Sequence, residues 1–235
     1  MFRTTKFAMV LFAFLAAIIA LPSAASAREN SLKKDKWALQ FQVSNFVNVN
    51  SFQGSTISIK KHVSDKAAWR LGLTLHFEVK DENTEVVLYP NTKAPGYNDL
   101  TDVRIGIALQ KVFYPNPTAD VNVCWGLGPT YSYEYRLSDR ENISRDRTYQ
   151  DKRSFEIHSW SLGINGILGV EWFATKSISF LAEYGTAVTY SQRITRTIRR
   201  SVRDGNLYLN QDSTNRLNGV SLSSSRVKFG LSVYF

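Results

Sequence analysis

Apolar residues recur at every second position over most of this chain of 235 residues. Period-two alternation places the apolar set on one side of a β-strand and the remaining residues on the other side. No helical face can be drawn through such a pattern, so it predicts long strands with one apolar face. The clearest run covers residues 69–80, and its apolar positions are Trp69, Leu71, Leu73, Leu75, Phe77 and Val79.

Seven further runs show the same alternation, which makes eight predicted strands in all. They cover residues 37–49, 57–63, 103–113, 121–135, 155–172, 178–190 and 220–235. In two of the runs the apolar residues change parity, which predicts a β-bulge at each change, because a bulge inserts one extra residue into a strand. The two predicted bulges lie near residues 158–159 and at residues 223–225.

Apart from the connection after the first run, which is short, the connections between these runs alternate in length. Residues 64–67, 114–120 and 174–177 form short turns, whereas the polar stretches 81–100, 138–153 and 192–218 predict long loops. Short turns on one side and long loops on the other are typical of membrane barrels, whose strand number is even. The sequence therefore predicts an all-β fold, an eight-stranded antiparallel transmembrane β-barrel with up-and-down meander order, over residues 37–235.

The first 27 residues predict export. Arg3 and Lys6 precede an apolar run over residues 7–21, and Ala25 and Ala27 form a small-residue cleavage site. This is the pattern of a secretory signal peptide over residues 1–27, removed after export and followed by a short polar lead over residues 28–36. The alternative, an uncleaved anchor, is disfavoured because the run is shorter than the roughly 18 apolar residues of a spanning helix.

Charge and cysteine content narrow the expected partners. The formal net charge is +9, which suits nucleic acid or an anionic membrane surface. Export favours the membrane surface, and we expect no nucleic-acid partner. A single cysteine, Cys124, excludes an internal disulfide.

The end of the chain resembles the terminal β-signal of outer-membrane barrels, which the barrel-assembly machinery binds during biogenesis. A polar residue, a glycine two positions later and two apolar residues define that signal, and the matching residues are Lys228, Gly230, Val233 and Phe235. Residues 64–72 and 169–185 are similar to strand–turn–strand units of the small eight-stranded outer-membrane β-barrel proteins, the broad OmpA/OmpX-like superfamily, in its barrel domain only. The resemblance implies a monomer in the outer membrane, in contact with membrane lipid and lipopolysaccharide.

The inner face of the predicted barrel carries charged residues. Because the interior of an eight-stranded barrel is just wide enough to be filled by side chains, these charges have to pair. We expect a structural ion-pair network, and the alternative is a narrow polar conduit for small solutes. The predicted lumen charges are Arg70, Glu78, Arg104, Glu134, Glu171, Glu183, Arg226 and Lys228.

The last predicted loop, residues 192–218, is rich in arginine. A guanidinium group can bind a phosphate through two parallel hydrogen bonds, which makes this loop a candidate site for anionic groups such as those of lipopolysaccharide. The alternative is a basic loop that is merely solvated. The candidate residues are Arg193, Arg196, Arg199, Arg200 and Arg203.

A catalytic site is not expected. His158, Ser159, Ser161 and Glu171 are candidates, but His158 shares its face with Trp160, while Ser161 and Glu171 face inward. Barrel lipid A deacylases carry a His-x-Ser pair on the outer surface, and here Trp160 stands at the third position. No metal-ligand spacing is present, and no cofactor is expected. The predicted function is a non-enzymatic outer-membrane barrel with a structural or surface-interaction role, with a conduit or a lipid A-modifying enzyme as alternatives.

Overall fold

The computed structural model describes residues 30–43, 55–88, 92–143, 149–224 and 227–235. The predicted signal peptide, residues 44–49 of the first predicted strand, and Arg226 lie outside these ranges. Within them no helix is long and apolar enough to cross a bilayer. The strands are β1 (Trp37–Val43), β2 (Ser55–Ser64), β3 (Ala67–Leu88), β4 (Thr92–Phe113), β5 (Val121–Ile143), β6 (Tyr149–Phe173), β7 (Ile178–Arg203), β8 (Asn206–Ser224) and β9 (Lys228–Tyr234).

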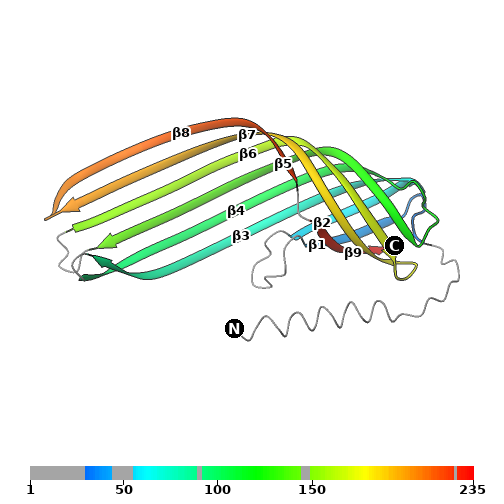
Figure 1. Ribbon diagram of the computed structural model, residues 1–235, viewed down its shortest axis with the longest axis horizontal. Helices are drawn as coiled ribbons and strands as arrows, with labels where there is room; N and C mark the ends of the chain where they lie inside the picture. The colour runs from blue at the N-terminus through cyan, green and yellow to red at the C-terminus, as the bar shows by residue number, and fades with distance from the viewer. Residues whose placement is uncertain (1–29, 44–54, 89–91, 144–148, 225–226) are drawn as a thin grey trace.

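Eight of these strands close into a ring (Figure 1). Each strand from β1 to β7 pairs antiparallel with the next, β7 also pairs with β9, and β9 pairs with β1. β8 pairs with β7 beyond the end of β9. β8 and β9 are thus consecutive parts of the eighth predicted strand, and the predicted eight-stranded meander is confirmed.

One predicted bulge is wrong, and the other, at residues 223–225, falls partly outside the described residues, although the pairs on either side of it show one extra residue. Between the pairs Thr186–Ser224 and Glu183–Lys228, β7 advances three residues while the β8–β9 side advances four. The extra residue accounts for the parity change predicted there. In β6 the register is continuous through His158 on both sides. The apolar parity changes there for another reason: β6 has passed the last large aromatic residue of its outer face, so apolar side chains no longer need to face outward.

The three predicted long loops are wrong, because most of their residues continue the strands; residues 89–91 and 144–148 lie outside the described ranges. β3 to β7 are 22 to 26 residues long and β8 has 19. The β7–β8 turn has only two residues, Asp204 and Gly205, with φ angles of 50° and 77°. Two central residues with positive φ are typical of the type I′ hairpin, for which Asp-Gly is a strong sequence signal. Hydrogen-bonded ladders to neighbouring strands hold these polar stretches in strand form.

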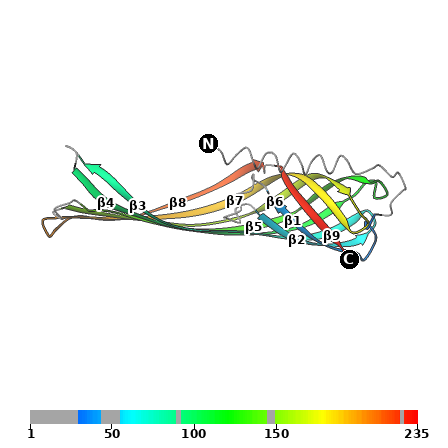
Figure 2. The same cartoon turned by 90° about the horizontal axis from the view of Figure 1, so that it is seen from below.

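The elongated parts of β3 to β8 form an open sheet, which we call the extension. β2 begins at Ser55, which pairs with Leu75, but β3 continues to Leu88. Beyond the pair Ser55–Leu75, no strand among the described residues lies across the gap between β3 and β8, so the sheet does not close there. Figure 2 shows the extension leaving the ring as a single curved layer. The fold therefore combines a closed barrel with a long open sheet.

The outer face of the ring is apolar and exposed, as a bilayer-facing surface has to be. Four of the five tryptophans lie at the end that carries the short turns, hereafter the turn end, whereas Tyr133, Trp160 and Tyr190 lie at the other end of the apolar band. Lys61 and Lys111, the charged residues predicted on this face, lie 5.1 and 5.4 Å from the ring centroids of Trp37 and Phe113. Exposed outward residues of the band include Trp69, Leu71, Leu73, Ile105, Ile107, Leu109, Trp125, Leu162, Ile164, Leu168 and Val188.

The length of β7 shows how far the extension reaches. The apolar band covers residues 178–190, which is slightly more than the 9–11 residues of a tilted transmembrane strand. Residues 191–203 continue beyond it. At roughly 3.3 Å per residue, they add about 40 Å of strand. The membrane-spanning segment is therefore about half of β7.

Gly128 is needed where the β4–β5 ladder is interrupted at Pro129, which has no N–H to donate. A Cβ atom at Gly128 would lie 1.9 Å from the carbonyl oxygen of Leu109. We expect Gly128→Ala to lower the free energy of unfolding by about 1–3 kcal/mol, the usual cost of overpacking. Urea unfolding in lipid vesicles measures this. Gly106→Ala is the control, because its nearest neighbour atom would be 3.5 Å away; equal losses in both variants would contradict the argument.

Candidate functional site

A buried ion pair closes the lumen at the turn end. Lys60 Nζ lies 3.1 Å from Glu171 Oε2, and both residues are fully buried. The Glu171 carboxylate also accepts hydrogen bonds from Tyr114 (2.8 Å), Tyr234 (2.7 Å) and Ser179 (2.5 Å). Lys60 also donates to the hydroxyl oxygens of Tyr114 (2.7 Å) and Tyr234 (2.5 Å). Every polar atom of the pair therefore has partners, and these side chains fill the lumen.

Residues 30–36 form a cap across the same end. Leu32 is 2% exposed and belongs to the same apolar cluster as Tyr114, Phe173 and Tyr234. The carbonyl oxygen of Lys36 accepts a hydrogen bond from the backbone N–H of His62 at the end of β2 (2.9 Å). The segment predicted as a short polar lead thus places one leucine against the plug of Lys60 and Glu171.

The cap is held by all three short turns. Asn30 Nδ2 donates to the carbonyl oxygens of Pro117 (2.5 Å) and Ala119 (3.0 Å) in the β4–β5 turn. The backbone N–H of Lys34 donates to Asp65 Oδ1 (2.8 Å) in the β2–β3 turn. Ser31 Oγ donates to the carbonyl oxygen of Lys176 in the β6–β7 turn. In the described part of the chain, the ion pair thus fills the lumen at this end and the cap covers it.

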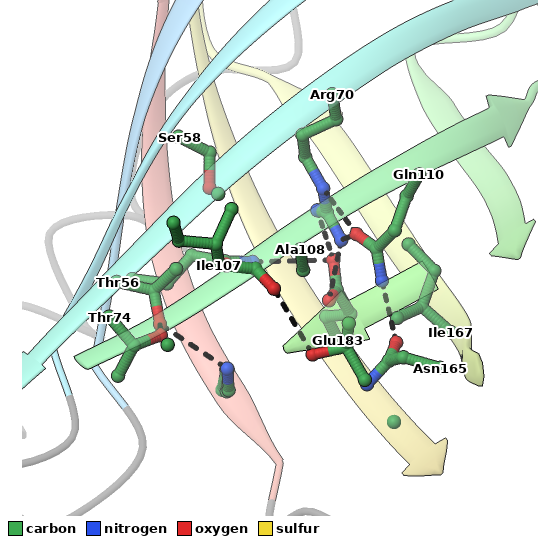
Figure 3. Close-up of a pocket in the computed structure, with 16 residues that line it drawn as sticks. Thr56, Ser58, Arg70, Thr74, Ile107, Ala108, Gln110, Asn165, Ile167 and Glu183 are labelled. Carbon is green, nitrogen blue, oxygen red and sulfur yellow. Dashed lines mark hydrogen bonds and ion pairs between the residues drawn. The ribbon is translucent and has the colours of Figure 1, made fainter. Parts of the chain in front are cut away.

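A second group of polar residues lies one level higher in the lumen (Figure 3). Arg70 binds Glu183 with both terminal nitrogens, at 2.6 and 3.0 Å. Its Nε and Nη2 atoms donate to Gln110 Oε1, at 2.9 and 2.5 Å, and Gln110 donates to Asn165 Oδ1 at 2.6 Å. Above this network lies a cavity of about 120 Å³, whose lining includes Arg70, Glu183 and Lys228. The lumen is therefore closed at the turn end and hollow above it.

A third group lies where the ring opens into the extension. Asp102 accepts hydrogen bonds from Arg104 (3.0 and 2.7 Å) and Arg136 (3.1 and 2.7 Å). Glu134 lies 3.3 Å from Arg104 and 3.4 Å from Arg136. His76 stands 3.9 Å from Asp102 and 3.7 Å from Glu78, which also pairs with Lys80.

The atoms of His76, Glu78 and Asp102 lie within 4.8 Å of one another, close enough to hold a metal ion. However, two arginines already neutralise Asp102 and a lysine binds Glu78. This arrangement is an ion-pair network and disfavours a further cation. Sequence reasoning missed Asp102 and Arg136 because their stretches were assigned to loops or to the strand ends.

Of the predicted lumen charges, seven lie within the described residues and all seven face inward. Lys60, the partner of Glu171, was missed, although its parity opposite to Ile57 and Ile59 would have placed it inward. Each of the seven takes part in one of the three groups or lines the cavity, and they are Arg70, Glu78, Arg104, Glu134, Glu171, Glu183 and Lys228.

The five predicted arginines lie on β7 and not in a loop. Because neighbouring residues of a strand face opposite sides, Arg196 and Arg200 are on the outer face of the extension, and the other three are on its inner face. Arg196 pairs with Asp212 of β8 (2.6 Å), and Arg199 pairs with Asp151 of β6 (3.2 Å). The five residues therefore do not form one cluster.

Asp151 is the centre of the ion pairs on the inner face of the extension. It accepts hydrogen bonds from Ser201 (2.7 Å), Arg199 (3.2 Å) and Arg153 (3.1 Å). Burial alone would raise the pKa of Asp151, but the hydrogen bonds from Ser201 and Arg199 outweigh burial and keep that pKa below its usual value. The resulting stabilisation is complete above the ordinary aspartate pKa of about 3.9 and is lost only as the pH falls through the lower folded pKa.

The catalytic candidates are not assembled. His158 bonds to Tyr133 through Nδ1 (3.0 Å) and to Glu156 through Nε2 (3.1 Å) on the outer face. Ser161 bonds to Ser132 (2.7 Å) on the inner face. A histidine and a serine on opposite faces of a sheet cannot transfer a proton between them.

The predicted β-signal lies at the seam of the ring. Trp37 and Phe235 exchange backbone hydrogen bonds of 3.1 and 3.0 Å, and Gly230 pairs with Gln42. A Cβ atom at Gly230 would lie 2.6 Å from the carbonyl oxygen of Phe41, so a larger residue would push β9 away from β1. Lys228 faces the lumen, while Val233 and Phe235 face outward.

Comparison with known proteins finds structural likeness alone. No protein-family model matches the chain, and neither does any curated protein. OprG of Pseudomonas aeruginosa, an outer-membrane protein, is 14% identical over 88% of this chain and 99% of its own, with a TM-score of 0.45. A major outer-membrane protein of Thermus thermophilus is 11% identical over 85% and 99%, with a TM-score of 0.43. CarO2 of Acinetobacter baumannii is 12% identical over 85% and 98%, with a TM-score of 0.38. By its closed antiparallel ring and exposed apolar outer face, this chain is a transmembrane β-barrel.

Proposed function

We propose that this protein is a non-enzymatic outer-membrane barrel that acts in surface interactions through its extension. The observation that carries the proposal is the length of β3 to β8, which continue well beyond the apolar band. Strands that only span a bilayer need about 9–11 residues. With the turn end in the periplasm, the extension projects from the outer surface, where a partner could bind it.

The closed turn end supports this role over that of a conduit. The pair of Lys60 and Glu171 fills the lumen, and Leu32 of the cap packs against the tyrosines that bind the pair. We expect the refolded protein to show no steady conductance in planar lipid bilayers. Its control is Lys60→Ala and Glu171→Ala together with residues 30–36 deleted, which removes the side chains that fill the lumen and the cap that covers it. A stable open channel formed by the unmodified chain would contradict the proposal.

Basic residues on the outer face of the extension suggest the partner. Arg200 of β7 and Arg216 of β8 are exposed, and neither pairs with a carboxylate of the described residues. Arg216 lies opposite Ile194 of β7, only a few residues beyond Tyr190 at the end of the apolar band. Phosphate groups of lipopolysaccharide lie at the height of Arg216, and guanidinium groups bind them through paired hydrogen bonds.

The inner face provides a matched test. Arg200→Gln with Arg216→Gln should weaken binding of lipopolysaccharide about five- to thirtyfold, since each exposed ion pair is worth up to about 1 kcal/mol. The loss should shrink as salt rises. Arg193→Gln with Arg203→Gln removes the same charge from the inner face and should change binding little. Equal loss of binding in both variants would mean that only the net charge matters. No loss in either variant would contradict the proposal that lipopolysaccharide is the partner.

A further inference from the structure

The lumen cavity contains a positive charge that its surroundings do not neutralise. Lys228 of β9 lines this cavity together with Arg70 of β3 and Glu183 of β7. Two positive groups and one negative group leave a net charge of +1 among these three residues. Arg70 holds both oxygens of Glu183, at 2.6 and 3.0 Å, and Gln42 donates to the same carboxylate at 3.3 Å.

Lys228 itself is poorly satisfied. Within the described residues its ammonium group has one hydrogen bond, a long one of 3.3 Å to Thr56 Oγ1, and no carboxylate within ion-pair distance. An ammonium group has three protons to donate. Placing such a charge in a protein interior is costly unless water or an anion compensates it. The cavity beside Lys228 is where such a compensating group would lie.

The cavity is the right size and polarity for a small anion. Its volume of about 120 Å³ is well above the roughly 10–15 Å³ that one water molecule needs. Thr56 and Thr74 share a hydrogen bond of 3.1 Å, and either hydroxyl could turn to donate to a ligand. Small residues on the facing wall, Gly106 and Ala108, leave the space free. Figure 3 shows Thr56, Thr74 and Arg70 around this space.

We propose that Lys228 and the threonine hydroxyls beside it form a binding site for a small, singly charged carboxylate in the lumen. One carboxylate oxygen would accept from the Lys228 ammonium group and the other from a threonine hydroxyl. The single excess charge favours a monoanion over a dianion. Because the turn end is closed, the ligand enters and leaves from the side of the extension. This site is separate from the outer face to which the proposed function assigns lipopolysaccharide.

The test is a titration of the chain, refolded in detergent, with sodium acetate at constant ionic strength. Isothermal titration calorimetry should detect acetate binding to the unmodified chain. Lys228→Met keeps the length of the side chain and removes its charge, and should weaken binding by at least about tenfold, the worth of one charge-assisted hydrogen bond. Lys61→Met removes a lysine of the same barrel from the outer face and should leave acetate binding unchanged.

A second measurement does not depend on any variant. Crystals of the unmodified chain soaked in sodium bromide should show an anomalous peak within hydrogen-bond distance of Lys228 Nζ, because bromide is a compact monoanion. Absence of acetate binding, equal binding by the unmodified chain and Lys228→Met, or a bromide-soaked crystal without that peak would each overturn the proposal. If Lys228→Met does not refold, the bromide peak alone decides.

Discussion

Glu171→Gln is expected to lower the free energy of unfolding by about 3–5 kcal/mol, because it leaves the ammonium group of Lys60 buried without a counter-charge. The two residues are fully buried and 3.1 Å apart. The hydroxyls of Tyr114 and Tyr234 can still donate to the amide oxygen of glutamine, so the loss reports mainly on the charge. Urea unfolding in lipid vesicles, followed by the shift between folded and unfolded bands on unheated gels, measures it.

A double-mutant cycle separates this pair from general damage to the lumen. Lys60→Met alone should also destabilise, because it leaves the carboxylate of Glu171 without its cation. The double variant, Lys60→Met with Glu171→Gln, removes both charges and should lose less stability than the sum of the two single variants. Strict additivity would mean that the two groups do not act as a pair.

Leu73→Arg is expected to lower the stability of the inserted barrel by about 2–4 kcal/mol, the cost of an arginine facing the middle of a bilayer. Leu73 is 39% exposed on the outer face of β3 and pairs with Ile57 and Ile107 on either side. Its position near the middle of the apolar band keeps an arginine from reaching either interface. Reversible urea unfolding in vesicles gives the free energy.

The control for Leu73→Arg is the same exchange outside the bilayer. Leu207, at the tip of β8, is 62% exposed and lies in the extension. Leu207→Arg should change stability by less than about 0.5 kcal/mol, as surface exchanges usually do. Similar losses at both positions would mean that the ring is not surrounded by lipid at Leu73.

The alternation of apolar and polar residues predicted the fold correctly in the part of each strand that crosses the bilayer. From Trp69 to Val79 each residue faces the side that its parity predicted, because lipid on one side and a filled lumen on the other leave no alternative register. The short turns at 64–67, 114–120 and 174–177 were likewise predictable, and so was the parity change between β8 and β9.

Beyond the bilayer this constraint ends, and there the sequence was misleading. Most described residues of the polar stretches that were interpreted as loops lie in strands, since backbone ladders do not require an apolar face. A local signal was nevertheless present, because Asp204-Gly205 is a hairpin dipeptide and its two positive φ angles allow a two-residue turn. The assignment of all five arginines to one anion-binding loop was wrong for the same reason, since a strand distributes them over two faces.

By itself the sequence determined which residues face lipid and which face the lumen, because side-chain parity along a strand is a local property. Only the tertiary structure decided which inward charges meet. Lys60 and Glu171 are 111 residues apart in the chain, and Arg70 and Glu183 are 113 apart. Their contacts depend on how the ring closes and on the stagger of its strands, which no local pattern encodes. The same closure leaves Lys228 beside a cavity while its cross-strand neighbour Glu183 is held by Arg70.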